Sequence, residues 1–214
     1  MKNNIYHISN SNMSAKIKNL NMEGANVFYI PRFFKHDETW FQMIDDSVDW
    51  ETFVIKLYGK KIPQPRQSCY IGDANNTYKY SGVVRKPSDW PVSVTEMKKI
   101  LDVLVKKINP LHPPLNAVLL NRYNDGSHYI SKHSDDEKEL NPDAFIVSVS
   151  LGATRDFIFT HKETNEKVSI ALESGSVILM GGDCQKNWVH EIPKRKKVKE
   201  PRINLTFRSI KPNI

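Results

Sequence analysis

A histidine and a carboxylate two residues apart, followed much later by a second histidine, are the residues of this sequence best suited to chemistry. They are His133, Asp135 and His190. Two imidazoles and one carboxylate on one side of a metal ion leave open positions for a chelating cosubstrate and oxygen, the arrangement of non-haem iron oxygenases. Structural zinc more often recruits cysteines, and the sequence holds only Cys69 and Cys184, far apart. We therefore interpret the three residues as a candidate iron(II) site.

An isolated His-x-Asp pair also has an ordinary explanation, a solvated loop. The chain holds a rival pair in His161 and Glu163, which run into a turn at 164–165, and we predict that this pair is exposed. The pair at His133 differs because a strand with polar residues precedes it and another follows the downstream histidine. The metal interpretation depends on these two strands.

The more informative of the two strands is Arg202–Arg208. A period of two puts its apolar residues on one face and Arg202, Asn204, Thr206 and Arg208 on the other. One explanation is an outer face in water, the usual place of charged strand residues. The other is an anion site inside a barrel, because the planar fork of arginine binds carboxylates bidentately and Asn and Thr add hydrogen bonds.

The earlier strand ends in Asn121 and Tyr123, whose side chains lie two apart and so point the same way. Residues of these types at a strand end are often only turn formers. Beside the arginine-bearing strand they would instead contribute to a pocket for a small dianion.

Short β-rich runs fill the chain from residue 116 onward, with turns and no helix between them. They span 117–123, 145–151, 156–160, 168–172, 176–180 and 203–209, and the turns lie at 124–126, 164–166 and 173–175. Two amphipathic helices precede them: Asp37 can cap the first, and Ser93 with Glu96 has capping-box spacing for the second. We predict a mainly β (α+β) fold, an antiparallel sandwich or jelly roll with the N-terminal helices buttressing a sheet.

The composition favours a single domain with an acidic partner. At 214 residues and 39% hydrophobic, the chain is long enough for one core and short for two. We expect a flexible arm over residues 1–25 and a folded domain over 26–214. The net charge of +7 and pI near 9.3 favour nucleic acid or an anionic membrane. No apolar run reaches the ~18 residues of a membrane span, and the start lacks the core of a signal peptide, so we expect a soluble, intracellular protein.

The motifs described above, in this order, closely resemble the AlkB family of Fe(II)/2-oxoglutarate dioxygenases, over about residues 58–208. Within that family, further short matches look most like the animal DNA-repair branch, homologues two and three. These matches are Tyr58-Gly59-Lys60, Pro65-Arg66, Gly72-Asp73, Thr77-Tyr78-x-Tyr80-Ser81-Gly82 and Arg155-Asp156-Phe157. The resemblance implies a double-stranded β-helix with Fe(II), 2-oxoglutarate and O2 at one open end. It also implies oxidative demethylation of 1-methyladenine and 3-methylcytosine in DNA, with release of formaldehyde.

The resemblance assigns further roles around the iron. Arg202 would bind the far carboxylate of 2-oxoglutarate, and Arg208 would also steady Asp135. The cosubstrate pocket would be completed by Asn121, Tyr123, Asn204, Thr206 and Arg208. Tyr78 and His133 would sandwich the damaged base, with contacts from a set made of Tyr80, Asp136 and Glu137. Carboxylates suit a cationic methylated base, although an acidic turn in water is the ordinary explanation of Asp136 and Glu137.

The same likeness places nucleic-acid contacts on two segments, one of them in a nucleotide-recognition region over about 51–92. There, Tyr58 would be an apolar finger that fills the gap left by a flipped base, with Arg66 nearby. After the distal histidine, a basic run would grip phosphates through Arg195, Lys196 and Lys197. Tyr58 could equally be a core residue, and the basic run a solvated loop.

The resemblance leaves the substrate partly open. Duplex DNA is favoured, single-stranded DNA or RNA remains open, and the basic run and finger weigh against a protein substrate. Two alternatives remain: an RNA demethylase of the same chemistry, and a catalytically silent nucleic-acid-binding relative. We expect a monomer, nuclear if the cell is eukaryotic.

Overall fold

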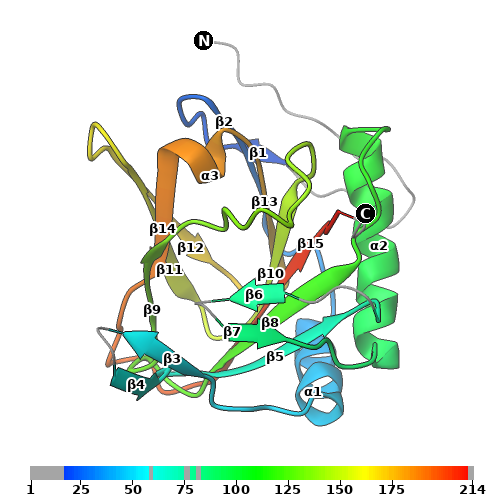
Figure 1. Cartoon of the computed structure of the whole chain (residues 1–214), viewed down its shortest axis with the longest axis vertical. Helices are drawn as coiled ribbons and strands as arrows, with labels where there is room; N and C mark the ends of the chain where they lie inside the picture. The colour runs from blue at the N-terminus through cyan, green and yellow to red at the C-terminus, as the bar shows by residue number, and fades with distance from the viewer. Residues whose placement is uncertain (1–16, 58–59, 75–77, 81–82, 212–214) are drawn as a thin grey trace.

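The computed structural model describes residues 17–57, 60–74, 78–80 and 83–211 and consists mainly of two antiparallel sheets. Within these residues the larger sheet has the strand order β1-β2-β13-β10-β15-β8-β5, and the smaller one β12-β11-β14-β9 (Figure 1). The larger sheet contains β1 (Lys18–Asn19), β2 (Ala25–Ile30), β5 (Gln67–Gly72), β8 (Ala117–Tyr123), β10 (Ile146–Gly152), β13 (Ser176–Gly182) and β15 (Arg202–Arg208). The smaller contains β9 (Ile130–His133), β11 (Arg155–His161), β12 (Lys167–Leu172) and β14 (Trp188–Ile192). The predicted jelly roll is confirmed.

Helices α1 (Asp37–Ser47) and α2 (Val92–Ile108) cover the outer face of the larger sheet (Figure 1). Between them in sequence come two short hairpins, β3 (Val54–Leu57) with β4 (Lys60–Pro63), and β6 (Tyr78–Tyr80) with β7 (Val83–Arg85). Helix α3 (Cys184–Asn187) is a single turn between β13 and β14. None of the described helices has both the length and the apolarity needed to cross a membrane.

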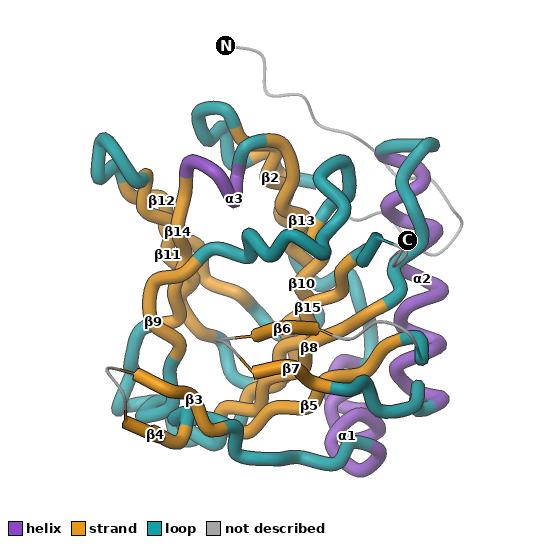
Figure 2. Tube along the Cα trace, in the orientation of Figure 1, coloured by secondary structure: helices purple, strands orange, loops and turns teal. Residues whose placement is uncertain are grey.

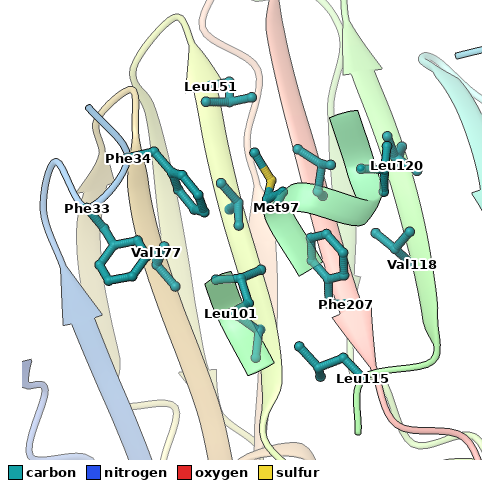
Figure 3. Packing of buried hydrophobic residues seen from close by; sticks show 14 of the residues in the cluster. Phe33, Phe34, Met97, Leu101, Leu115, Val118, Leu120, Leu151, Val177 and Phe207 are labelled. Carbon is teal, nitrogen blue, oxygen red and sulfur yellow. The ribbon is translucent and has the colours of Figure 1, made fainter. Parts of the chain in front are cut away.

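The main core lies between α2 and the larger sheet. Met97 and Leu101 on the helix pack with Val118 and Phe207 of the sheet, and each is completely or almost completely buried (Figure 3). A second cluster lies between the two sheets and includes aromatic residues such as Trp188. The central strands of the larger sheet, such as β10 and β13, therefore have one face toward the helices and one toward the smaller sheet.

The helix starts differ from the predicted caps. Helix α2 begins at Val92 after an extended Pro91, and no side chain caps it. Because the helix begins directly after Pro91, Ser93 lies in the first turn. The Ser93 hydroxyl forms a hydrogen bond with the Ser47 hydroxyl at 2.8 Å. The predicted capping box is therefore wrong. Asp37 is the first residue of α1 rather than its cap, a position where a negative charge still favours the helix dipole.

The predicted N-terminal arm ends earlier than residue 25. Strand β1 pairs with β2, so that Lys18 lies opposite Tyr29. Ile17 and Met22 are buried, the first under the helices and the second between the sheets. These apolar residues pack in the two clusters, so the predicted boundary of the arm is wrong for residues 17–25. Residues 1–16 lie outside the described part of the chain.

Replacing Leu101 with alanine should lower the free energy of unfolding by about 2–5 kcal/mol, because the side chain is fully buried in the main cluster. Urea denaturation followed by circular dichroism measures the change. Val103→Ala on the same helix is the matched control, since Val103 is 55% exposed and its loss should change stability by less than about 0.5 kcal/mol. Equal losses for both variants would contradict the assignment of the core.

Candidate active site

Strand β15 turns its polar face into the protein. All of its residues are buried, and Ile203, Leu205 and Phe207 belong to the cluster beneath the helices. The opposite face lines a cavity between the sheets, with Asn204, Thr206 and Arg208 among its lining residues. The water-exposed alternative for this face is therefore wrong, and the structure favours an anion site inside the barrel.

Strand register brings the other predicted pocket residues to the same face. Asn204 pairs with Asn121 on β8 and with Ser150 on β10, and Arg202 pairs with Tyr123. Side chains of residues paired directly across a sheet lie on one side of it. Both neighbouring strands thus add polar groups to the face that carries the arginines.

Arg202 keeps two hydrogen-bond donors for a ligand. Its Nη2 donates to Ser150 Oγ at 2.9 Å, whereas Nε and Nη1 are buried without a hydrogen-bond partner among the described residues. Burial lowers the pKa of Arg202 to about 10, which still leaves the group charged at neutral pH. A buried guanidinium with unmet donors is costly. A carboxylate such as the far one of 2-oxoglutarate would satisfy it.

The amides of Asn121 and Asn204 are oriented by neighbouring groups. Ser68 Oγ donates to Asn121 Oδ1 at 2.8 Å, and Asn204 Nδ2 donates to Ser148 Oγ at 2.8 Å. The two serines of β10, Ser148 and Ser150, were not predicted as pocket residues. The alternation of serine with apolar residues along β10 is a signal that could have found them, because it places both serines on one face.

The candidate metal ligands come together in the lining of this cavity. His133 ends β9, Asp135 follows it on the long loop to β10 (Figure 2), and His190 on β14 pairs directly with His133. The potential donor atoms of the three residues lie within 4.8 Å of one another. They are the only such group of histidine, cysteine or acidic side chains in the described residues. The donor set and its spacing fit one iron(II) ion.

The protonation states of the ligands suit a metal. Burial raises the pKa of Asp135, but the guanidinium of Arg208, together with the nearby His190 and His133, outweighs this effect and lowers the value to about 2. Arg208 Nη2 lies 3.0 Å from Asp135 Oδ2, the contact that the resemblance implied. Burial and the charge of His133 lower the pKa of His190 to about 3. The site therefore offers a carboxylate and a neutral imidazole at neutral pH, as metal binding requires.

The rival pair at His161 has a structural role. His161 is buried, not exposed as predicted, and its ring packs edge-on against Trp188 with centroids 4.9 Å apart. Its Nδ1 accepts hydrogen bonds from the backbone N–H groups of Glu163 and Thr164 at 3.3 and 3.2 Å. The imidazole therefore stabilises the turn that the sequence indicated.

The structure describes the side chains of only some of the residues expected to contact the substrate. Asp136 is exposed and Glu137 half-buried, and both line a cavity of about 640 Å³ that also reaches Asp135. The backbone of β6 carries Tyr78 and Tyr80, whose side chains lie outside the described structure, as does the whole of Tyr58.

Arg66 does not lie on the surface, as a phosphate contact would. It is buried, and its Nε donates to Asn121 Oδ1 at 2.8 Å. The reason is that β5 begins at the next residue and pairs with β8, which brings Arg66 beside Asn121. The predicted nucleic-acid contact is therefore corrected to a residue that orients Asn121.

The basic run forms an exposed loop after β14. Arg195, Lys196 and Lys197 are all exposed. The loop is nevertheless attached to the turn after β8, because the Arg195 backbone N–H donates to the Gly126 carbonyl at 2.6 Å and the Gly126 N–H to the Val198 carbonyl at 2.9 Å. We call residues 193–198 the basic loop.

Gln185 on α3 supports the segment that carries Asp135 and was not predicted. Its Oε1 accepts a hydrogen bond from the backbone N–H of Asp135 at 2.9 Å, and its Nε2 lies 3.7 Å from Met180 Sδ. A lone glutamine far from His133 in sequence belongs to none of the periodic patterns or motifs, so no sequence signal indicated it.

Replacing Gln185 with alanine should weaken iron(II) binding about 10-fold, because the loop that carries Asp135 loses a hydrogen bond while the ligand atoms remain. Anaerobic calorimetric titration with iron(II) measures the affinity. Lys186→Ala, at the exposed neighbouring position, is the control and should bind like the wild type. If Gln185→Ala also bound iron at the wild-type affinity, the positioning role would be excluded.

Comparison with known proteins defines the class of this site. Residues 26–208 match the model of the 2OG-Fe(II) oxygenase superfamily, so the chain belongs to that superfamily, and its cofactors are Fe(II), 2-oxoglutarate and O2. The protein is similar to the Mus musculus DNA oxidative demethylase ALKBH2, with 36% identity over 208 residues that cover 91% of this chain and 84% of the mouse protein. The Arabidopsis thaliana protein of the same name is 33% identical, covering 87% of this chain and 67% of its own.

A further relative and a solved structure agree with this placement. The Homo sapiens alpha-ketoglutarate-dependent dioxygenase alkB homolog 3 is 35% identical over 159 residues, which are 70% of this chain and 53% of the human protein. The structure of OsALKBH1 covers 88% of this chain and 99% of its own chain with a TM-score of 0.60 at 20% identity, which supports the fold alone. The resemblance to the AlkB family is confirmed.

Proposed function

We propose that this protein is an oxidative demethylase that repairs N-alkylated bases in DNA, chiefly 1-methyladenine and 3-methylcytosine. The observation that carries the proposal is the group of His133, Asp135 and His190 in the lining of a buried pocket, together with the unmet donors of Arg202 on β15. Bound iron(II) supplies oxygen activation, coupled to decarboxylation of 2-oxoglutarate to succinate, and the hydroxylated methyl group leaves as formaldehyde. The names of the ALKBH2 relatives support DNA as the substrate.

The residues of the chain position both substrates. Arg202 holds the far carboxylate of the dianion, and Asn121 and Asn204 present oriented amides beside it. Asp136 and Glu137 face the cavity beyond Asp135, where their charge suits a cationic methylated base. This arrangement favours an N-alkylated base, which carries a positive charge, over an unmodified neutral base.

The nucleic acid itself contacts two surfaces in this proposal. Arg195, Lys196 and Lys197 of the basic loop bind phosphates of a duplex, while the region over 51–92, with Tyr58, Tyr78 and Tyr80, approaches the extruded nucleotide. The exposure of the loop supports the first of these roles. The enzyme acts as a monomer and, in a eukaryotic cell, in the nucleus.

The test supplies iron(II), 2-oxoglutarate and an oligonucleotide with one 1-methyladenine, as duplex DNA, single-stranded DNA or RNA. Mass spectrometry follows loss of the methyl group, and succinate is measured in parallel. Wild type should demethylate the duplex fastest, and His133→Ala should be inert. A fastest rate on RNA would select the RNA alternative. If neither wild type nor His133→Ala removed the methyl group from any substrate, the demethylase activity would be refuted. That result would favour a catalytically silent nucleic-acid binder.

A further inference from the structure

The first three residues of β11, which are Arg155, Asp156 and Phe157, make different contacts around the site. Phe157 stacks on the His190 ring with centroids 5.1 Å apart. Asp156 accepts a hydrogen bond from Arg195 of the basic loop. Arg155 is 1% exposed and points into the protein, although no role in iron, cosubstrate or base binding requires it there. A buried arginine needs a reason, because burying its charge is costly.

Arg155 fixes two loops that are distant in sequence. Its Nη2 donates to the Pro193 carbonyl at 2.6 Å and to the His128 carbonyl at 2.9 Å, and its Nη1 donates to the Asp125 carbonyl at 3.2 Å. Pro193 is the first residue of the basic loop, and the other two lie in the turn that pairs with that loop. One rigid guanidinium therefore attaches the start of the basic loop to the barrel.

The same guanidinium borders the cosubstrate pocket. Its Cζ lies 5.8 Å from the centre of the Tyr123 ring, and Arg202 Cζ lies 5.2 Å from the same centre. Neither arginine forms an ion pair with a carboxylate in the described part of the chain. Two buried cations on one ring repel each other, so a dianion that neutralises Arg202 also favours Arg155 in its present position.

We propose that Arg155 is a positioning residue that couples the cosubstrate pocket to the basic loop. When 2-oxoglutarate binds Arg202, Arg155 holds the Pro193 carbonyl more firmly and the loop keeps the conformation that meets phosphates. Because coupling between two sites is reciprocal, phosphate contacts at the loop favour cosubstrate binding to the same extent. The importance of the coupling for DNA rests on the proposed function; the coupling itself does not.

Limited proteolysis by trypsin tests the coupling, because Lys194, Arg195, Lys196 and Lys197 are all cleavage sites in the basic loop. Wild type is digested with Mn(II) in place of iron, with and without 2-oxoglutarate, and cleavage sites are mapped by mass spectrometry. The cosubstrate should slow cleavage within the loop about fivefold, the lower end of ordinary coupling strengths. Arg155→Lys keeps the charge but loses the fork, so its loop should be cut faster and should not respond to 2-oxoglutarate.

Two further variants separate this role from a general loss of structure. Arg32→Lys alters an exposed arginine that pairs with Glu173 and should behave as wild type. Gly126→Ala opens the loop from the other side, because its Cβ would lie 1.7 Å from the Arg195 carbonyl oxygen. It should speed loop cleavage and, because the coupling is reciprocal, it should also raise the dissociation constant for 2-oxoglutarate although the Arg155 guanidinium is intact. Arg155→Lys should raise that constant as well.

Kinetics on the duplex oligonucleotide give a second readout: Arg155→Lys should raise the KM for DNA about tenfold with little change in kcat, as expected for lost positioning of a binding loop. Loop cleavage in Arg155→Lys at the wild-type rate, or with the same protection by 2-oxoglutarate, would overturn the inference. If 2-oxoglutarate protected the loop of the wild type from trypsin as expected, but the wild type removed no methyl group from DNA, the proposed DNA function would be refuted. The coupling itself would stand.

Discussion

Replacing Asp135 with asparagine should abolish methyl removal and weaken iron(II) binding by about 100-fold or more, beyond what losing a supporting residue costs. The amide keeps the size of the side chain but removes the charge that holds the metal. It also removes the carboxylate that lies 3.0 Å from Arg208 Nη2, in a pair whose side chains are both 4% exposed. The free energy of unfolding of the metal-free protein should therefore fall by about 3–5 kcal/mol. Calorimetric titration and urea denaturation measure the two effects.

The matched control for Asp135→Asn is Asp45→Asn. Asp45 forms an ion pair with Arg122 at 2.7 Å, but this pair is partly exposed and remote from the metal ligands. Its loss should cost about 1 kcal/mol or less and should leave iron affinity and turnover unchanged. Wild-type iron affinity in Asp135→Asn would show that the carboxylate is not a ligand.

The second large effect is expected for Arg202→Lys, which should raise the KM for 2-oxoglutarate about 100-fold or more. A lysine ammonium cannot reproduce the bidentate fork, and it would leave Ser150 without its present partner. Breaking a buried, hydrogen-bonded charge pair in this way costs about 2–5 kcal/mol. Since the far carboxylate is bound equally before and during reaction, kcat at saturation should change much less.

Initial rates of succinate formation over a range of 2-oxoglutarate concentrations separate KM from kcat for this variant. Arg122→Lys is the control, because Arg122 lies on the neighbouring strand but pairs with Asp45 away from the cavity. It should keep the wild-type KM. An unchanged KM in Arg202→Lys would place the cosubstrate elsewhere in the protein.

The fold was predictable where side-chain periodicity is strong. The run over 117–123 is observed as β8 with the same bounds, and the alternation over 203–209 correctly separated the buried apolar face of β15 from its polar face. Strand β14 was missed, although it carries His190, because hydrophobicity does not alternate along its sequence; only the burial of its side chains does. Its place is determined by pairing with β11 and β9.

The site was predictable to the extent that its chemistry requires rare combinations of residue types. Two histidines and a carboxylate, followed by a strand with two arginines, suffice to indicate an iron and a dianion. The supporting residues were not predictable in the same way. Gln185 and Ser150 have common side chains, and their roles arise only because loop paths and strand register bring them to Asp135 and Arg202.

By itself, the sequence determined which chemistry to expect, because the candidate ligand set of His133, Asp135 and His190 and the polar face of β15 follow from residue type and spacing. Tertiary structure decided whether that face meets water or a cavity, and it moved Arg66 from a surface contact to a buried position beside Asn121. It also revealed Arg155 as the link between pocket and loop. The physical reason is that burial and long-range hydrogen bonds depend on how strands pair, which no local pattern specifies.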